Sequence, residues 1–338
     1  MFRKLIVVLA VLAVAAVAGA QKPPAGTDEA FPVARLVKSL ELGKPIAHGG
    51  LAIIPIYREG ARDKSAYVTL EDALRNGWIL ISEVEAGRVP QVQISNLSRR
   101  AIFLMGGEIL TGCRQDRILA QDILLGPGTK NLLAPVFCVE QGRWHATSNG
   151  FTSKQNLGTP AMRAVALSKG AAAQSEIWDR VAAENRKLGV ASPTEAYQDA
   201  YEKDGNRTAV RSIEEKMKDA PFLEGDTVGV VIGIGGEIVS ADIFADPDLF
   251  AKEWPKILRS SALSSLGGPR GVSLGLGEAA DFLRSILDRR YRAQDGLDLG
   301  TEYVANDRDA QIRALADKSA IVHLSAFPQD KDRIKVVR

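Results

Sequence analysis

The sequence predicts an α+β protein, with a mixed, mostly antiparallel, β-rich core, a helical segment at about residues 160–220, and C-terminal helices packed on the core. Two observations lead to this fold class. Strand-like runs are grouped apart from helix-like runs along the chain, which favours α+β over a parallel α/β sheet. Hydrophobic residues make up 46% and charged residues 25% of the 338 residues, which is the composition of a globular protein with a substantial core.

The first 20 residues have the pattern of a secretory signal peptide. The basic pair Arg3-Lys4 precedes an apolar run from Leu5 to Val17, and Ala18-Gly19-Ala20 supplies the small residues of a cleavage site. The run is about thirteen residues long, short of the roughly twenty that span a membrane. We therefore expect cleavage after Ala20, export to the periplasm or the extracellular space, and no stable membrane insertion of the mature chain.

The remaining chain is expected to contain a spacer, one domain and a tail. Residues 21–44 begin with a polar stretch that contains proline and glycine, and this stretch predicts a spacer. Residues 45–325 are long enough for a single large domain. Residues 326–338 end in a charged segment that we expect to be a tail.

Residues 51–139 alternate short apolar runs with turn residues, which is the pattern of a β-rich block. One short helix is expected from Thr69 to Asn76, with Thr69 as its N-cap. The expected strands are Leu51–Tyr57, Ile79–Glu85, Gln91–Asn96, Ala101–Met105, Ile118–Leu125 and Leu132–Val139.

Residues 160–219 change to helical spacing, because Ala173, Ile177, Val181 and Leu188 fall near one stripe of a helix. The sequence Ser192-Pro193-Thr194-Glu195 has the pattern of a capping box with proline in the first turn, and it is expected to start a further helix.

The C-terminal third combines strands and helices. The apolar runs Val228–Gly233 and Ile238–Phe244 are separated by a Gly-Gly-Glu turn, which predicts a hairpin. Asp246-Pro247 is expected to cap and begin a helix. The remaining expected elements are a helix at about Glu278–Arg292 and closing strands at Ala310–Leu315 and Ala320–Phe327.

Charge and cysteine patterns limit the partners and cofactors. The 43 basic and 41 acidic residues are interleaved, so no nucleic-acid-binding surface is expected. Three scattered histidines and two cysteines do not have the spacing of zinc ligands, and neither a metal nor a cofactor is expected. Cys113 and Cys138 allow a disulfide in an oxidising compartment, but Cys138 also suits a small buried hydrophobic position.

Polar residues gather at strand ends of the first β block. Planar guanidinium groups suit phosphate oxygens, an indole suits the face of a base, and carboxylates accept hydroxyl protons. Glu140 and Arg143 could equally form a local ion pair that only supports the fold. Asp242, inside an apolar strand, is expected to bond the backbone of the following turn. The candidate ligand-binding residues are Glu108, Gln115, Arg117, Glu140, Arg143 and Trp144.

Two motifs in this block carry a family resemblance. They are residues 106–117, which begin Gly-Gly-Glu-Ile-Leu, and residues 138–144, Cys-Val-Glu-Gln-Gly-Arg-Trp. Together they resemble the signature of the ARPP-1 domain, the ARG and rhodanese-phosphatase-superfamily-associated protein domain, formerly a domain of unknown function. The resemblance covers roughly residues 45–325. It implies a connection with ADP-ribose or related nucleotides, and it implies no established reaction.

Three functions follow as hypotheses. The first is an exported protein that binds a small anionic ligand, such as a nucleotide- or ADP-ribose-derived molecule. The second is a hydrolase in which Glu108 and Glu140 share acid and base work with support from an arginine. The third is a non-catalytic structural or interaction protein of the cell envelope. Candidate residues that line one concave surface would favour binding or catalysis, whereas Arg143 buried against Glu140 would favour a structural role.

Overall fold

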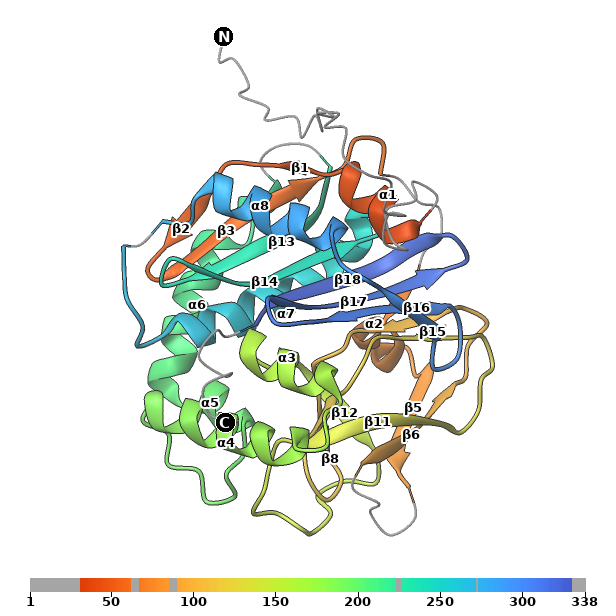
Figure 1. The fold of residues 1–338 in the computed structure, drawn as a ribbon. Coiled ribbons are helices and arrows are strands. Elements are labelled where there is room, and N and C mark those ends of the chain that lie inside the picture. The colour runs from red at the N-terminus through yellow and green to blue at the C-terminus, as the bar shows by residue number, and fades with distance from the viewer. Residues whose placement is uncertain (1–30, 62–66, 85–89, 223–225, 272, 330–338) are drawn as a thin grey trace.

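The computed structural model describes residues 31–61, 67–84, 90–222, 226–271 and 273–329, and the signal peptide expected at residues 1–20 lies outside them. The described residues form one large sheet and two smaller sheets (Figure 1). In the large sheet β2 (Ile46–His48) pairs with β3. The other strands follow the spatial order β1 (Glu41–Leu42), β3 (Leu51–Tyr57), β13 (Thr227–Ile234), β14 (Glu237–Phe244), β18 (Ala320–Pro328), β17 (Ala310–Asp317), β16 (Thr301–Asn306) and β15 (Arg292–Asp295).

The centre of the large sheet confirms the predicted hairpin. Strands β13 and β14 pair antiparallel around the Gly235-Gly236 turn, and both of these glycines have positive φ. Strand β14 then pairs antiparallel with β18, so that Asp242 stands opposite Ser325 and Phe244 opposite His323. Two polar side chains from distant parts of the sequence, Asp242 and His323, therefore lie on adjacent strands in the middle of the sheet.

Most of the first β block folds into the two smaller sheets, whereas β3 belongs to the large sheet and β12 (Phe151–Leu157) joins from outside the block. One smaller sheet has the order β12, β8 (Glu108–Gly112), β9 (Arg117–Leu119), β11 (Leu132–Cys138), β6 (Gln91–Asn96) and β5 (Ile79–Glu83). The other has the order β10 (Ile123–Leu125), β7 (Ile102–Leu104) and β4 (Val68–Thr69), and its β4–β7 pair is parallel. The mixed, mostly antiparallel α+β class is confirmed. The single strand expected over Ile118–Leu125 is two strands, because residues 120–122 leave the sheet between β9 and β10.

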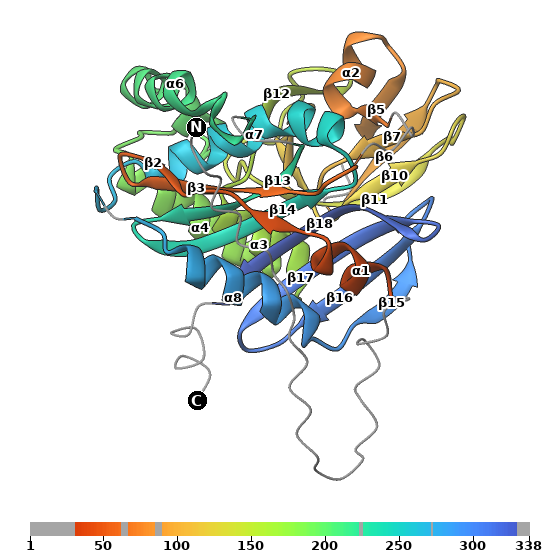
Figure 2. The same ribbon diagram turned by 90° about the horizontal axis from the view of Figure 1, so that it is seen from above.

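Helices cover both faces of the large sheet (Figure 2). Helices α1 (Pro32–Lys38) and α8 (Leu276–Leu287) pack on one face, and α3 (Pro160–Ser168) and α7 (Pro247–Ser265) pack on the other. Asp246 caps α7 by accepting a hydrogen bond from the Leu249 amide, as predicted. The other helices are α2 (Leu70–Arg75), α4 (Ala173–Lys187), α5 (Gln198–Glu202), α6 (Asp204–Met217) and the short 3-10 helix η2 (Ala220–Phe222).

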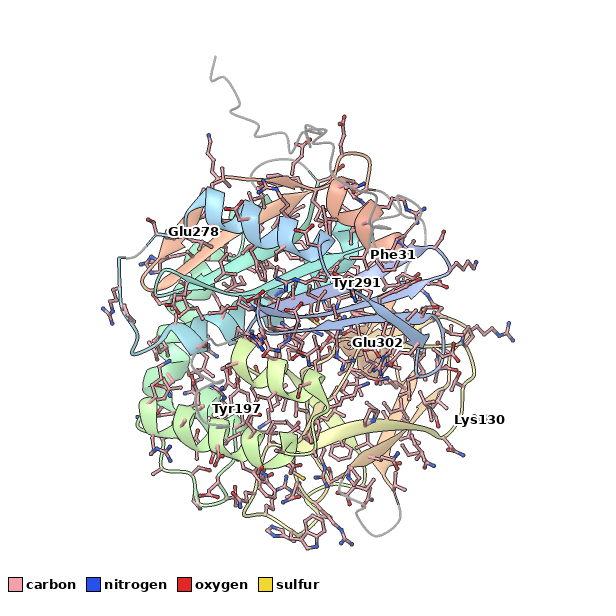
Figure 3. All side chains as sticks on the ribbon, viewed as in Figure 1. Phe31, Lys130, Tyr197, Glu278, Tyr291 and Glu302 are labelled. Carbon is pink, nitrogen blue, oxygen red and sulfur yellow. The ribbon has the colours of Figure 1, made fainter. Side chains whose placement is uncertain are left out.

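Both ends of the described chain are more ordered than the sequence suggested. Helix α1 lies inside the segment expected to be a spacer, residues 21–44, and buries Val33, Leu36 and Val37. Phe31, just before it, packs against Tyr291 at a ring-centroid distance of 5.3 Å (Figure 3). At the other end β18 continues to Pro328, inside the segment expected to be a charged tail. Apolar side chains that pack on the sheet order both segments.

Two helix predictions were wrong in their bounds. The capping-box sequence at Ser192 does not start a helix, because Thr194 is held elsewhere: its carbonyl accepts from the Gly142 amide at 2.8 Å, and the next helix begins at Gln198. The helix expected over Glu278–Arg292 ends at Leu287, and residues 292–295 form the edge strand β15 instead. Within the described residues, no helix is both long and apolar enough to cross a membrane.

Candidate functional site

The two motif segments meet at one end of the six-stranded sheet. Residues 112–117 connect β8 to β9, and residues 139–150 leave β11, which pairs antiparallel with β9. The antiparallel pairing places the start of β9 beside the end of β11, so Gln115, Glu140 and Arg143 come together although they are up to 28 positions apart. The structure thus brings three of the six candidate residues into contact.

Arg143 is the centre of this group, and its guanidinium is buried with only 9% of the side chain exposed. Its Nε donates to Glu140 Oε1 at 2.8 Å, and its Nη2 lies 2.6 Å from Glu140 Oε2. The same side chain donates to the Cys113 carbonyl at 2.5 Å and to Asp116 Oδ1 at 3.1 Å. We call Arg143, Glu140 and Asp116 the arginine knot, because they join the loops that follow β8 and β11.

The titration of the two carboxylates agrees with a structural role. Burial opposes ionisation of Glu140, yet the hydrogen bonds from Arg143, the Asp116 amide and Thr194 keep its pKa below the usual value. Burial raises the pKa of Asp116 to about 6, and the charge on Glu140 adds to this rise. The guanidinium therefore forms its closest ion pair with Glu140, and Asp116 completes the shell around it.

The side chains of Gln115 and Arg117 also form hydrogen bonds within the protein. Gln115 Nε2 donates to the Glu140 carbonyl at 2.8 Å, and its Oε1 accepts from Arg117 Nη1 at 3.3 Å. Arg117 is 1% exposed, contacts the sulfur of Cys138 and lies 3.7 Å from Glu83. Neither side chain faces solvent, so neither can meet a ligand without rearrangement.

Trp144 is the only one of the six candidate residues whose side chain is largely exposed. Its relative exposure is 51%, and the guanidinium carbon of Arg114 lies 5.8 Å from its ring centroid. This cation–π contact is of the exposed kind, which stabilises by about 0.5–1 kcal/mol. Trp144 is therefore presented at the surface by the arginine knot, and it does not take part in it.

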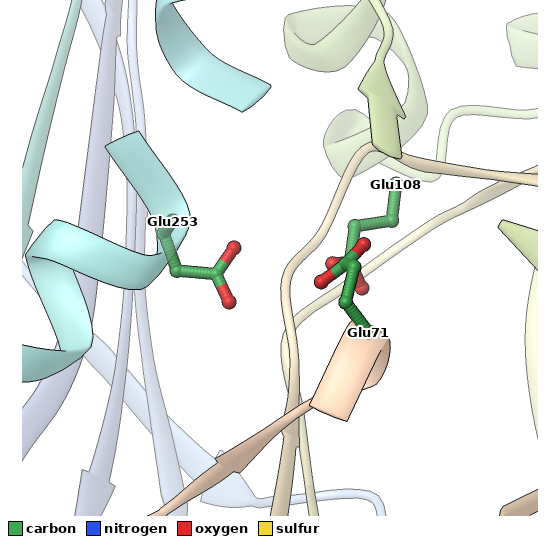
Figure 4. A group of neighbouring side chains, drawn as sticks. All are labelled: Glu71, Glu108 and Glu253. Carbon is green, nitrogen blue, oxygen red and sulfur yellow. The ribbon is translucent and has the colours of Figure 1, made fainter. Parts of the chain in front are cut away.

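Glu108 lies in a different cluster, away from the arginine knot. Its carboxylate, together with those of Glu71 on α2 and Glu253 on α7, points into one shared space (Figure 4). The ammonium of Lys256 on α7 contacts Glu108 and lies 2.7 Å from an oxygen of both Glu71 and Glu253. We call these four residues the lysine cluster. It joins α2, β8 and α7.

The lysine cluster has more carboxylates than cations. Burial raises the pKa of Glu108 well above its usual value and also raises that of Glu253, against the attraction of Lys256. Ligand oxygens of the three carboxylates lie within 4.8 Å of one another, which is the spacing of a cation site. The Lys256 ammonium lies within hydrogen-bonding distance of all three, and it supplies the positive charge there.

A second buried network lies between the large sheet and α3. Arg163 on α3 donates to both carboxylate oxygens of Asp242, at 2.9 and 2.7 Å. His323 on β18 bridges Asp242 at 3.2 Å and Asp122 at 2.7 Å. Although burial opposes its protonation, Asp122 raises the pKa of His323 to about 9, with a further contribution from Asp242. Asp242 thus bonds side chains from two other elements, and not the backbone of the next turn as expected.

The Gly-Gly-Glu motif of residues 106–108 connects the lysine cluster with the buried network around Arg163 and Asp242. Gly106 donates its amide to Asp122 at 2.7 Å and accepts from Arg163 at 3.3 Å, and Glu108 contacts Lys256. Gly107 has φ +97°, and a Cβ there would lie 2.5 Å from the Arg163 side chain. Glycine is thus required where the Arg163 side chain crosses the turn. The motif that carried the family resemblance has a clear structural function.

Both cysteines are free and buried. Cys113 is 3% and Cys138 is 1% exposed, and Cys138, the last residue of β11, lies between Phe137 and Val139 in the chain. Burial raises the pKa of the Cys138 thiol to about 11. The interpretation of Cys138 as a small buried hydrophobe describes its position, and the structure contains no bond between the two sulfurs.

A cleft of about 270 Å³ opens where β12, α5, α6 and α7 meet. Arg259 on its wall pairs with Glu214 at 2.7 Å, and Lys154 pairs with Glu202. The Arg211 side chain has no hydrogen bond or ion pair to any residue that the structure describes. We call this the cationic cleft, since four cations and two carboxylates line it. The charged lining residues are Lys154, Glu202, Arg207, Arg211, Glu214 and Arg259.

The sequence patterns did not predict this cleft, the lysine cluster or the network around Arg163 and Asp242. One signal was present: Arg207 and Arg211 are four residues apart on one helix, which puts two like charges on the same face. The cleft also needs β12, a strand that the sequence pattern did not predict. Its lining comes from residues 154–259, outside the motif block.

Taken together, the fold and its polar residues define an α+β domain with buried ionic networks, a motif loop held by internal hydrogen bonds, and a cationic cleft. The chain belongs to the ARPP-1 family, whose description is ARG and Rhodanese-Phosphatase-superfamily-associated Protein domain, and the family match covers residues 39–327. This confirms the resemblance seen in the two motifs. No curated protein and no solved structure matches the chain.

Proposed function

We propose that this protein binds a small anionic ligand in the cationic cleft. The observation that carries the proposal is the lining itself, in which four cations face two carboxylates around a cavity of about 270 Å³. The excess positive charge attracts anions, and guanidinium groups bind phosphate or carboxylate oxygens in a planar, two-pronged fashion.

The size of the cleft limits the ligand. Small-molecule sites typically enclose about 300–1,000 Å³, so this cleft, at about 270 Å³, is slightly smaller than that range. It suits a phosphorylated sugar, or one end of a nucleotide- or ADP-ribose-derived molecule. In this proposal the motif residues that were ligand candidates support the fold, since Gln115, Glu140 and Arg143 bond one another.

The hydrolase alternative has less support. An acid and base pair works best when its two carboxyl groups face a shared cleft without cationic partners. Glu108 contacts Lys256, and Glu140 pairs with Arg143. Each carboxylate therefore has a local structural partner, and the two belong to separate clusters. For the arginine knot, the structural alternative is the better supported one.

A thermal-shift titration of the purified protein tests the proposal. Ribose 5-phosphate and ADP-ribose should raise the melting temperature, and neutral ribose should not. Arg211→Gln should abolish the shift, because it removes the cation that has no internal partner. Arg180→Gln is the control, since Arg180 is a partly exposed helix arginine that does not line the cleft. No shift with either anion at millimolar concentration would refute binding.

Export remains part of the proposal, and it rests on the leader sequence alone. Residues 1–30 fused to a reporter enzyme that folds only outside the cytoplasm should give an active, exported reporter. Replacement of Leu9 and Val11 by Asp should abolish that activity by interrupting the apolar run. Edman sequencing of the exported protein should begin at Gln21.

A further inference from the structure

We infer that the cationic cleft selects a phosphate monoester in its dianionic form, and that Glu202 and Glu214 set this selectivity by competing with the ligand for two of the cations. The inference rests on the proposed function and names the ligand class and the residues that tune the site. It follows from the way in which the charges of the cleft are already paired.

Two of the four cations pair with carboxylates that themselves line the cleft. Lys154 on β12 pairs with Glu202 on α5, and Arg259 on α7 pairs with Glu214 on α6. Gln198 also donates to Glu202 at 3.4 Å, so this carboxylate has a second contact within the lining. An incoming anion must displace these carboxylates or bind where they do not reach.

The other two cations form a pair on one helix face. Arg207 and Arg211 are separated by one helical turn of α6, and both line the cleft. A like-charge pair at this spacing destabilises a helix, and Arg207 lies close to the N-terminal end, where the helix dipole disfavours a cation. The positive charge of Arg207 is partly balanced by its ion pair with the exposed Asp204. The Arg211 side chain has no ion pair among the described residues, and it lines the cleft, so it is available to an incoming anion.

Two guanidinium groups one helical turn apart, both in the cleft lining, match a group with several oxygens and two charges. A phosphate monoester has three terminal oxygens and is a dianion above its second pKa of about 6. A carboxylate or a phosphodiester has one charge and fewer free oxygens, so it satisfies only one fork. The two carboxylates in the lining repel every anion, and only the doubly charged group gains enough from the arginine pair to offset that repulsion.

The neutral part of the lining suits the rest of such a ligand. Asn156 and Gln198 are buried and hydrogen-bonded to each other at 3.0 Å, and Tyr201 lies beside them. Amide and phenol groups can exchange hydrogen bonds with sugar hydroxyls. The cleft therefore combines a phosphate position at α6 with a hydroxyl-binding wall at β12 and α5.

Isothermal titration with four probes tests the inference: ribose 5-phosphate, a 3′,5′-cyclic nucleotide as the diester, acetate and neutral ribose. At pH 7.5 the monoester should bind about tenfold or more tightly than the diester, as expected for loss of one charged hydrogen bond. Its affinity should fall between pH 7 and pH 5, where the ester gains a proton. Equal affinity for the monoester and the diester would overturn the inference.

Variants of the carboxylates separate this inference from the proposed function. Glu202→Gln and Glu214→Gln should each bind the monoester several-fold more tightly, because each frees a cation. Glu215→Gln is the control, since it changes the same charge on α6 outside the cleft and should leave affinity unchanged. If anions bind but Glu202→Gln does not tighten binding, the competition is refuted and the binding function stands. If no anion binds the parent protein or any variant, both fail.

Discussion

The guanidinium of Arg163 and the carboxylate of Asp242 form a two-pronged ion pair that is almost completely shielded from solvent, with side-chain exposures of 1% and 0%. The pair joins α3, in the helical segment, to β14 at the centre of the large sheet. His323 adds a bond from β18 to the same carboxylate. One aspartate thus connects the helical segment with two adjacent strands of the core.

Asp242→Asn should destabilise the protein by about 3–5 kcal/mol, because it leaves the buried charge of Arg163 without its partner. Urea denaturation measures this loss directly. Asp281→Asn serves as the control, since it breaks an exposed pair with Arg284 and should cost less than about 1 kcal/mol. A loss below 1 kcal/mol for Asp242→Asn would show that the pair is not needed for stability.

Stability should fall on the alkaline side as His323 loses its proton. The pKa of His323 is raised to about 9, so its contribution is complete below about pH 6.5 and is lost as the pH rises through 9. The expected slope is about −1.4 kcal/mol per pH unit within that window. Denaturation at pH 7 and 8 should give a steeper decline for the parent protein than for His323→Gln, and equal slopes would contradict the assignment.

The same network predicts the opposite dependence in acid. Although burial opposes ionisation of Asp242, Arg163 and His323 keep its pKa below its usual value. Its contribution to stability is therefore present above the unfolded pKa of about 3.9 and is lost as the pH falls through the lower folded value. Denaturation between pH 5 and 2 should show this loss in the parent protein. Asp242→Asn should lack that component, and a variant that keeps the full acid dependence would exclude Asp242 as its source.

The lysine cluster should respond differently to the loss of a carboxylate and the loss of the cation. Glu253→Gln should be neutral or stabilising near pH 7, because it removes one of three carboxylates that share one ammonium. Lys256→Met should cost about 3–5 kcal/mol, since it leaves buried carboxylates without a cation. The comparison uses the free energy of unfolding in urea. If Glu253→Gln lost more stability than Lys256→Met, the cluster would not be limited by its single cation, and this prediction would be wrong.

Substitutions in the arginine knot and at the exposed indole of Trp144 should change the free energy of unfolding in urea by different amounts. Arg143→Met should destabilise by about 3–5 kcal/mol through the unpaired Glu140 carboxylate. Trp144→Ala should change stability by about 1 kcal/mol or less, because the indole is 51% exposed and its contact with Arg114 is weak. Similar losses for the two variants would mean that Trp144 belongs to the structural core of the motif.

Much of the fold was predictable because local patterns and tertiary packing agree. Strands β3 and β6 have the predicted bounds, and the hairpin of β13 and β14 follows from its Gly-Gly turn. The helix that begins after Asp246 follows from its cap. At Ser192 the local signal failed, since a tertiary hydrogen bond from Gly142 and the positive φ of Glu195 hold that segment outside a helix.

The candidate residues were found by their chemistry, but their partners were not. A polar side chain at a strand end gives the same sequence pattern whether it contacts solvent, a ligand or a buried counterion. Arg143 became a structural residue only when the loop after β8 supplied Asp116 and the Cys113 carbonyl. The sequence pattern places Glu108 with Glu140 among the polar residues at strand ends, but Glu108 lies instead beside Lys256, 148 positions away.

The sequence by itself determined the fold class, the family and the presence of charged residues in the motif block, because apolar periodicity, caps and motif spacing are local properties of the chain. Only the tertiary structure decided which charges are internal and which face a cleft. Ion pairs such as Arg163–Asp242 and Glu108–Lys256 join residues that are distant in the chain, and the cationic cleft is assembled from one strand and three helices. Those relationships depend on packing, which local sequence patterns do not encode.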